Sequence, residues 1–324
     1  MRPLSPVEPP SPSPGVPRRS ACIGLALSIG CGAPVGSYIP PGYHPDTVYR
    51  VFFVGDSITA DYEESPIAPD LSYPSLLVAA DRTTRGDVYW EGSSERNLYA
   101  HFPEIERSYN LAMPGAVAAD LDAQVGDFLA QIDHIEGRVP NGAPPSDPAD
   151  RLGETLVLVT IGGNDSQDLL SMAGGANMTT GHGRRLGARI GADLKRMQSQ
   201  LEESFPEGVW LYAANVYEPT GRGNRGGPCM PAGAAIFTDE LARGTNKALR
   251  EAAEESRFAM LDSHGLFMDH GYGATDPAAN PADAEAREPA HWFADCIHPN
   301  ARGQHALREM FLDAVLGPLE SGGR

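Results

Sequence analysis

The residue types needed for nucleophilic catalysis stand in four short motifs of this chain. In chain order they are residues 55–59 (GDSIT), 110–115 (NLAMPG), 162–165 (GGND) and 295–299 (DCIHP). Together they supply a serine hydroxyl, an imidazole, a carboxylate and several hydrogen-bond donors. A hydroxyl is a weak nucleophile that needs a base beside it and donors for the negative charge it generates. The four motifs are therefore candidates for one site, if the fold brings them together.

Ser57 is the candidate nucleophile. It stands just after a run predicted as a strand, residues 49–54, and before a turn. There the hydroxyl can project from the sheet edge, and the N–H groups of the turn face the same space. Alone, Gly-Asp-Ser is a weak signal, because a capping or loop residue is the more frequent explanation. The chain has no G-x-S-x-G motif, which argues against an ordinary α/β-hydrolase.

Three groups could stabilise an oxyanion at the same place. Gly115 and Asn164 follow the second and third predicted strands. The N–H groups of Ser57 and Gly115 and the side chain of Asn164 would then converge from neighbouring strands. Loss of one such donor typically costs about 10²–10³ in rate. The structural alternative is a tight turn at Gly115 and an Asx-turn or helix cap at Asn164.

Asp295 and His298 are the candidate acid and base. Their three-residue spacing lets one short loop carry both, so that the carboxylate orients the imidazole while the imidazole reaches the serine. The alternative for His298 is a helix-capping role. The other eight histidines lack this context and are expected at the surface or in structural hydrogen bonds: His44, His101, His134, His182, His264, His270, His291 and His305.

Strand and helix patterns alternate along the chain. Short apolar runs predict strands at residues 49–54, 107–112, 155–161, 209–216 and 258–262, and helical patterns predict helices at 116–131, 184–204, 237–257 and 300–316. Composition predicts loops at residues 136–153, 217–235 and 271–290. This alternation predicts one α/β domain over residues 49–317, with a parallel sheet covered on both faces.

The composition is that of a folded domain. Of 324 residues, 41% are hydrophobic and 21% are charged, which excludes a disordered chain. The formal net charge is −18, so no nucleic-acid partner is expected. No apolar run reaches the roughly 18 residues that a membrane-spanning helix needs.

With these motifs in this order, the chain resembles the SGNH/GDSL hydrolase (esterase/lipase) superfamily. The family fold is a three-layer α/β/α sandwich with a five-stranded parallel sheet of the flavodoxin-like type, in a single domain. The resemblance implies a serine hydrolase in which Ser57 is the nucleophile, His298 the general base and Asp295 the residue that orients it. It also implies an oxyanion hole made by Ser57, Gly115 and Asn164.

The expected reaction is hydrolysis of a carboxylic ester through an acyl-enzyme, with no metal or organic cofactor. The substrate is a small-molecule, glycan or lipid ester, and short-acyl or carbohydrate acetyl esters are favoured. The alternatives are an acyltransferase of the same fold and a non-catalytic surface lipoprotein that binds glycan or lipid. A metallohydrolase is a weaker alternative, because its candidate ligands match no compact zinc motif: His264, Asp269, His270 and His291.

The N-terminus is predicted to be an export signal. A basic pair at residues 18–19 precedes an apolar stretch at residues 21–30, which is the pattern of a secretory signal peptide. Residues 28–31 (SIGC) resemble a bacterial lipoprotein box, with Ser where Leu is preferred, so Cys31 is the candidate lipidation site. We expect an exported bacterial protein, either membrane-anchored through Cys31 or secreted or periplasmic. The alternative is an N-terminal tail with a short apolar stretch.

The expected boundaries are 1–30 for the signal peptide, 31–48 for a linker and 318–324 for a C-terminal tail.

Cys229 and Cys296 remain as a pair once the signal peptide and Cys31 are set aside. An oxidising compartment favours a disulfide between them. It would stabilise the fold by roughly 4 kcal/mol on the chain-entropy model. The alternative is two unrelated thiols.

Replacing Cys229 or Cys296 by Ser is expected to lower stability and turnover together, because the disulfide would anchor the loop that carries Asp295 and His298. Thermal unfolding and initial rates measure the two effects. Two reactive thiols in the native mature protein, found by a thiol assay, would contradict the pairing.

Overall fold

The computed structural model describes residues 35–60, 72–78, 97–135, 151–172, 178–219, 234–268, 270–271, 292–295 and 297–320, and of these it describes only the backbone at 234–238 and 318–320. The chain divides into two units, Met1–Ala33 and Pro34–Arg324. Every described residue belongs to the second unit.

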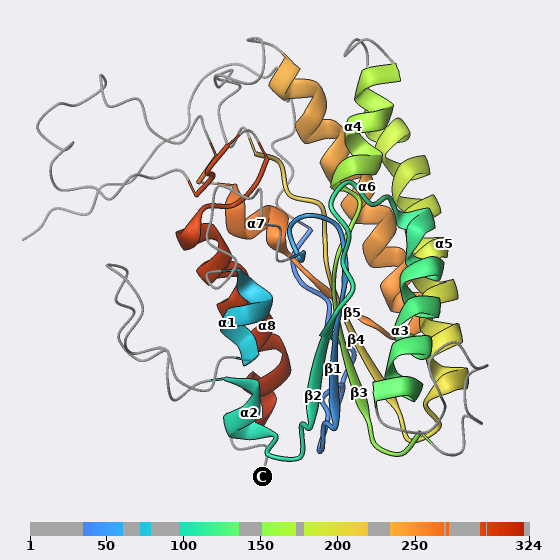
Figure 1. Ribbon diagram of the computed structural model, residues 1–324. Coiled ribbons are helices and arrows are strands. Elements are labelled where there is room, and N and C mark those ends of the chain that lie inside the picture. The colour runs from blue at the N-terminus through green and yellow to red at the C-terminus, as the bar shows by residue number, and fades with distance from the viewer. Residues whose placement is uncertain are drawn as a thin grey trace, which may run out of the picture. The chain divides into compact units, whose positions relative to one another are not determined.

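A five-stranded parallel sheet forms the centre of this unit (Figure 1). The strands are β1 (Arg50–Gly55), β2 (Arg107–Asn110), β3 (Thr155–Thr160), β4 (Val209–Ala214) and β5 (Ala259–Leu261). Their order in the sheet is β2-β1-β3-β4-β5. Each strand overlaps one that the sequence predicts, so the expected parallel sheet is confirmed.

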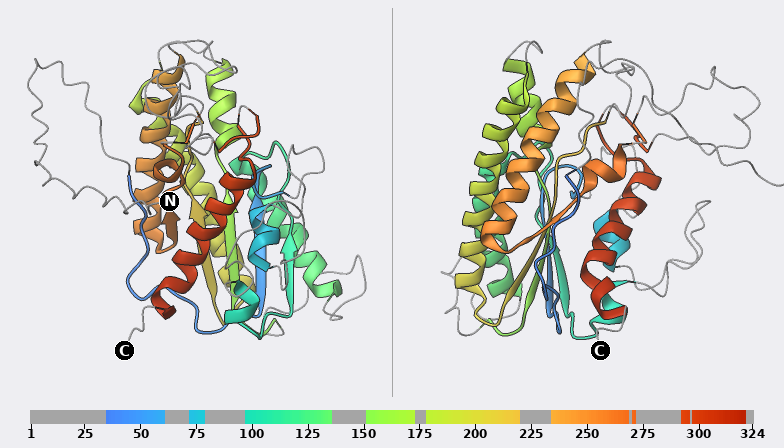
Figure 2. Two further views of the ribbon diagram at one scale, coloured as in Figure 1. Left: turned by 90° about the vertical axis from the view of Figure 1, so that its left-hand side faces the viewer. Right: turned by 180° about the vertical axis from the view of Figure 1, so that it is seen from behind.

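Helices cover both faces of the sheet (Figures 1 and 2). One face packs against α3 (Leu121–Ile135), α4 (Gly163–Met172), α5 (Thr180–Ser204) and α6 (Ala234–Ser256), and the other against α1 (Tyr73–Val78), α2 (Leu98–His101), α7 (Ser263–Phe267) and α8 (Ala301–Glu320). This is the expected three-layer α/β/α sandwich. None of the described helices is long and apolar enough to cross a membrane.

The strands are apolar on both faces because successive side chains point to opposite sides of a sheet. In β1, Phe52 and Val54 belong to the core under α3, α5 and α6. Val51 and Phe53 belong to the core under α1, α7 and α8. Two buried layers therefore require the nearly continuous apolar runs by which the sequence predicts these strands.

The sequence pattern does not reveal four of the helices. α1, α2, α4 and α7 have ten residues or fewer, too few for a helical period to stand out. α7 begins after Asp262, whose carboxylate accepts a hydrogen bond from Gly265 N–H at 3.0 Å. α4 begins inside the GGND motif, which places Asn164 in its first turn.

The start of the first expected helix is wrong by five residues. Residues 116–120 do not form the first turns of α3, because Val117 is extended and a 3₁₀ turn follows at Ala118–Asp120. The carboxylate of Asp120 accepts a hydrogen bond from Val117 N–H at 2.9 Å. Because this contact stabilises the 3₁₀ turn, the α-helix begins only at Leu121.

Residues 35–40, within the expected linker, lie along the edge of β5. Tyr38 forms an antiparallel bridge with Met260, and both N–H···O distances are 2.7 Å. The N–H of Gly36 donates to the carboxylate of Asp262 at 3.2 Å. An edge strand leaves backbone groups without partners, so this segment satisfies part of one edge of the sheet.

α5 and α6 pack closely because small residues line their contact. A Cβ at Gly183 would lie 2.1 Å from the carbonyl oxygen of Leu241. A Cβ at Gly187 would lie 2.2 Å from the carbonyl oxygen of Thr245. Both distances are far inside van der Waals contact. The two glycines therefore set how close the helices come, and with that the position of Leu241 near the site.

Gly183→Ala is expected to destabilise the fold by about 2–3 kcal/mol, because the added methyl group forces the two helix backbones apart. Urea unfolding measures this loss. Gly126→Ala in α3 is the matched control: nothing lies within 4 Å of its Cβ position, so the better helix propensity should raise stability by about 0.5–1 kcal/mol. Equal stabilities for the two variants would contradict the close packing.

Candidate active site

The predicted site residues meet at the carboxyl edge of the sheet. Ser57 follows β1, Gly115 follows β2 and Asn164 follows β3. In a sheet of order 2-1-3-4-5, ligands bind where the order reverses, between the first and third strands. β1 and β3 are direct neighbours here, so Ser57 and Asn164 stand on the two sides of that point.

Gly55 fixes the direction in which the chain leaves β1. Its φ is +130°, and a Cβ there would lie 1.9 Å from the carbonyl oxygen of Thr160 in β3. Gln124 of α3 holds the same residue, with Oε1 accepting from Gly55 N–H at 2.8 Å and Nε2 donating to Gly55 O at 2.9 Å. Only glycine fits this position. Ser57, two residues later, is placed by this constraint.

Ser57, His298 and Asp295 form a continuous hydrogen-bonded chain. The distance from Ser57 Oγ to His298 Nε2 is 2.9 Å, and the distance from His298 Nδ1 to Asp295 Oδ2 is 2.7 Å. A carboxylate can only accept, so Nδ1 carries the ring hydrogen and Nε2 is left to accept from the serine hydroxyl. This tautomer has the lone pair that a general base needs.

A short turn sets the positions of Asp295 and His298 relative to each other. Asp295 Oδ1 accepts from the N–H groups of Ile297 and His298 at 2.8 and 2.7 Å. Phe293 and Pro299 form a bridge on the two sides of the turn. Asn300 then caps α8 by accepting from the N–H groups of the first turn. The three-residue spacing of Asp295 and His298 follows from this turn.

The Asp295 carboxylate is stabilised in its charged form. Burial raises the pKa of Asp295, but hydrogen bonds from the N–H groups of His298 and Ile297 and from the His298 ring outweigh burial and lower the pKa below its ordinary value. Asp295 therefore remains an anion at neutral pH. An anion at this place stabilises positive charge on the imidazole.

The three predicted oxyanion donors follow β1, β2 and β3 at the carboxyl edge of the sheet. Within the described part of the chain, the N–H groups of Ser57 and Gly115 have no hydrogen-bond acceptor. Asn164 Nδ2 donates one hydrogen to the carbonyl oxygen of Ala116 at 2.9 Å, which ties the loop after β3 to the loop after β2. Its second amide hydrogen is left for a ligand. Gly115 adopts φ +81°, a conformation that favours glycine.

A buried carboxylate, Asp56, lies directly beneath these groups. Its Oδ1 accepts from Ile58 N–H and from the Thr160 hydroxyl, both at 3.1 Å. The Thr160 hydroxyl lies 2.6 Å from that of Thr59, which lies 2.8 Å from the hydroxyl of Tyr73. Each hydroxyl has one hydrogen, so the chain of donors runs from Tyr73 to Asp56.

Burial dominates the electrostatics of Asp56. It raises the pKa of Asp56 to about 6, although hydrogen bonds from Ile58 and Thr160 and the charge of His298 act in the opposite direction. At neutral pH the group is still mostly an anion. Its charge then adds to that of Asp295 in attracting a protonated His298.

A mainly apolar cavity of about 110 Å³ opens beside Ser57. It lies among the loops after β1, β3 and β4 and the helices α4, α6 and α7. Its apolar lining includes Ile58, Ile161, Leu170, Val216 and Leu241. A small number of polar side chains join them, among them Asn215, Glu218 and Ser263. Such a cavity suits a small apolar group attached to the atom that Ser57 attacks.

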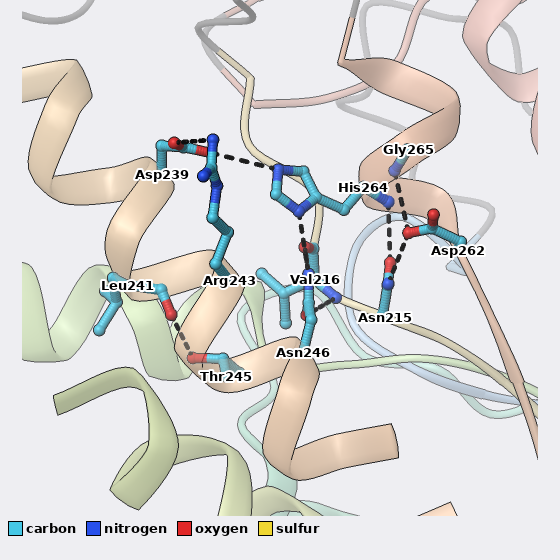
Figure 3. Close-up of polar contacts among 10 residues, drawn as sticks. All are labelled: Asn215, Val216, Asp239, Leu241, Arg243, Thr245, Asn246, Asp262, His264 and Gly265. Carbon is cyan, nitrogen blue, oxygen red and sulfur yellow. Dashed lines mark hydrogen bonds and ion pairs between the residues drawn. The ribbon is translucent and has the colours of Figure 1, made fainter. Parts of the chain in front are cut away.

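A polar cluster around Asn246 and His264 holds Val216, one of the residues that line the cavity (Figure 3). Asn246 of α6 binds the backbone of Val216 twice, accepting from its N–H at 2.9 Å and donating to its carbonyl oxygen at 2.7 Å. His264 Nδ1 lies 3.3 Å from Asn246 Nδ2, and its Nε2 lies 3.6 Å from Asp239. His264 therefore has structural partners.

The described residues contain no group of three His, Cys, Asp or Glu side chains that could hold a metal ion. Of the four metal-ligand candidates, His264 belongs to the cluster behind the cavity, and His270 stacks on Trp292 with ring centroids 3.4 Å apart. Asp269 and His291 lie outside the described residues, as do Cys31, Cys229 and Cys296. The lipidation and the disulfide stay predictions.

Three residues matter at this site that motif reasoning does not reveal as functional: Asp56, Gln124 and Thr160. Asp56 stands inside the GDS motif, but its burial depends on the packing of β3 and α1. The contacts of Gln124 and Thr160 with β1 come from α3 and β3. Sequence carries no signal for them beyond a polar residue in an apolar pattern.

The parallel sheet with helices on both faces is consistent with an SGNH-type fold. A family model described as GDSL-like lipase/acylhydrolase matches residues 51–311. The chain therefore belongs to the GDSL-like lipase/acylhydrolase family and is a carboxylic ester hydrolase. This confirms the family that the four motifs indicate.

The chain is similar to solved structures of lipases and of an esterase. An extracellular lipase from Streptomyces rimosus is 17% identical, with 85% of this chain and 99% of that chain covered and a TM-score of 0.50. A lipase from a goat rumen metagenome is 14% identical, with 83% and 97% covered and a TM-score of 0.50. An acetylxylan esterase from Geobacillus stearothermophilus is 18% identical, with 83% and 94% covered and a TM-score of 0.46. No curated protein matches the sequence.

Asp56→Asn is expected to change how stability depends on pH. The folded pKa of about 6 lies above the ordinary unfolded value of about 3.9. The stability that Asp56 contributes is therefore lost as pH rises from about 4 to above 6. Asparagine keeps an acceptor oxygen without the charge and avoids this loss, which amounts to at most about 3 kcal/mol.

Urea unfolding at about pH 4 and about pH 7.5 tests this expectation, because the variant should gain relative stability at the higher pH. Asp127→Asn, at an exposed position of α3, is the control and should show no such pH dependence. A difference in stability between Asp56→Asn and the unmodified protein that stays constant with pH would contradict the raised pKa of Asp56.

Proposed function

We propose that this ester hydrolase acts through a covalent acyl-enzyme on Ser57. The observation that carries the proposal is the pair of hydrogen bonds made by His298, at 2.9 Å to Ser57 Oγ and at 2.7 Å to Asp295 Oδ2. A serine becomes a useful nucleophile when a base accepts its proton and a third group orients that base.

The reaction follows from these positions. His298 Nε2 takes the hydroxyl proton as Ser57 Oγ attacks the carbonyl carbon, and Asp295 stabilises the resulting imidazolium. The oxyanion accepts hydrogen bonds from the N–H groups of Ser57 and Gly115 and from Asn164. His298 gives its proton to the leaving alkoxide, and the alcohol departs. Water, deprotonated by His298, then attacks the acyl-enzyme and releases the acid.

We also propose that the acyl group is short, as in short-chain esters or acetylated carbohydrates. The cavity beside Ser57 measures about 110 Å³, whereas an apolar cavity of roughly 150 Å³ holds one benzene molecule. An acyl group of a few carbons fits this space. The apolar lining suits an acyl chain better than a sugar ring, so the alcohol part of the substrate would lie on the solvent side of Ser57.

Export is the remaining part of the proposal. A basic pair, an apolar stretch and the SIGC sequence precede the described domain. They support cleavage of a signal peptide before Cys31 and a lipid on Cys31 that would hold the enzyme at a membrane surface. Mass spectrometry of the mature protein, isolated from membranes, would detect that lipid.

Ser57→Ala is expected to reduce kcat by at least about 10³-fold, because the acyl-enzyme can no longer form. Residues 32–324 would be assayed on p-nitrophenyl esters from acetate to palmitate. Turnover should be highest for the shortest chains, because they fit the cavity. Ser108→Ala, at an exposed position of β2, is the matched control and should keep the full rate.

Two results would overturn these proposals. Full turnover by Ser57→Ala would exclude the serine mechanism, and a palmitate optimum would exclude the short-acyl preference. Added alcohols that capture the acyl group faster than water would instead indicate an acyltransferase.

A further inference from the structure

We propose that Tyr217 is a positioning residue for the catalytic base, because its hydroxyl holds the turn that carries Asp295 and His298. The inference rests on the proposed serine mechanism and adds a residue to it. Tyr217 stands three residues after the end of β4, on a loop that belongs to none of the four motifs.

The hydroxyl of Tyr217 donates to the carbonyl oxygen of Ile297 at 2.5 Å. Ile297 is the residue immediately before His298, and its own N–H donates to Asp295. This one contact therefore reaches the peptide between the acid and the base. It joins segments 80 positions apart in the sequence.

The ring of Tyr217 supports the same turn from one side. Its centroid lies 4.8 Å from that of Phe267 and 5.6 Å from that of Phe293. Phe293 begins the bridge that closes the turn, and Phe267 packs against it at 5.3 Å. The aromatic rings thus fix the base of the turn, and the Tyr217 hydroxyl fixes its tip.

The hydroxyl remains a donor in the pH range of interest. Burial raises the pKa of Tyr217 well above its ordinary value, and the charges of Asp56 and Asp295 raise it further. Tyr217 therefore stays protonated beside two carboxylates. Because its hydrogen goes to the Ile297 carbonyl, it does not compete with His298 for Asp295.

The backbone beside Tyr217 is itself anchored (Figure 3). Asn246 of α6 makes two hydrogen bonds to the backbone of the preceding residue, Val216. Asn215 Oδ1 accepts from His264 N–H at 2.8 Å. The loop after β4 is thus fixed to α6 and α7, and Tyr217 can transmit that rigidity to the turn of His298.

The effect on the reaction should be on turnover. A base displaced by about 1 Å can cost about 10²-fold in rate. Tyr217 is also among the residues that line the cavity, so a variant must keep its ring for substrate binding to stay the same. Phenylalanine at position 217 keeps the ring and its packing and removes only the hydroxyl. The variant separates positioning from packing.

The test compares Tyr217→Phe with Tyr212→Phe on a short p-nitrophenyl ester. Tyr212 lies in β4, and its hydroxyl donates to the carbonyl oxygen of Tyr43 at 3.2 Å, away from the site. Both variants lose one hydroxyl-to-carbonyl hydrogen bond, so both should unfold at a slightly lower temperature, by about 2–4 °C. Only Tyr217→Phe should lower kcat, by about 10- to 100-fold, with KM changed less than twofold.

The rate of inactivation by a serine-directed fluorophosphonate is the second readout, because it reports how well Ser57 is activated. It should fall in parallel with kcat in Tyr217→Phe and stay unchanged in Tyr212→Phe. A kcat for Tyr217→Phe equal to that of Tyr212→Phe would overturn the inference, as would a rise in KM that accounts for the whole loss. Neither result touches the proposed function, which depends on Ser57→Ala being inactive.

Discussion

The contact between His298 Nε2 and Ser57 Oγ joins residues 241 positions apart, and most of the features around the sheet edge serve to hold its two sides. On the serine side, Gly55 lies close to Thr160 and is held by two hydrogen bonds from Gln124. These contacts fix the direction in which the backbone leaves β1. On the histidine side, a turn closed by Phe293 and Pro299 carries both members of the acid–base pair. A hydrogen bond of 2.9 Å between two loops persists only when both backbones are fixed independently of it.

The buried carboxylates at the two ends of the sheet have different kinds of partner. Near the start of β3, Arg151 binds Asp133 through two hydrogen bonds of 2.9 Å, and both side chains are buried. There each charge cancels the other. At the carboxyl edge, the partners of the Asp56 carboxylate among the described residues are an N–H group and a hydroxyl, and burial raises its pKa. The site thus holds an unfavourable anion near His298, where the proposed mechanism generates positive charge during proton transfer.

Two structural elements connect the catalytic groups with the cavity. α4 starts in the GGND motif, so Asn164 stands at its first turn while Leu170, two turns later, lines the cavity. The loop after β4 likewise contributes Val216 to the cavity and Tyr217 to the turn of His298. In the proposed mechanism, acyl-group recognition and the alignment of His298 therefore depend on the same backbone segments. A change that moves the backbone of one of these segments will affect both.

Local sequence patterns are enough to predict the sheet, the long helices and the candidate catalytic and oxyanion residues. Apolar runs buried on two faces, amphipathic helical periods and four motifs at strand ends are local patterns, and each of them is legible without the rest of the chain. The family match over residues 51–311 agrees with them. The short helices α1, α2, α4 and α7 are absent from that prediction, because fewer than three turns carry too little periodicity.

The contacts that support the site become visible only in the folded structure. The raised pKa of Asp56, the size of the cavity, and the contacts of Asn246 with Val216 and of Tyr217 with Ile297 all join elements that are distant in the chain. They depend on how closely helices and strands pack, as at Gly183 and Leu241. Packing distances are a property of the assembled layers. For that reason the sequence predicts the residues proposed to do the chemistry, and it does not predict the contacts that hold them in place.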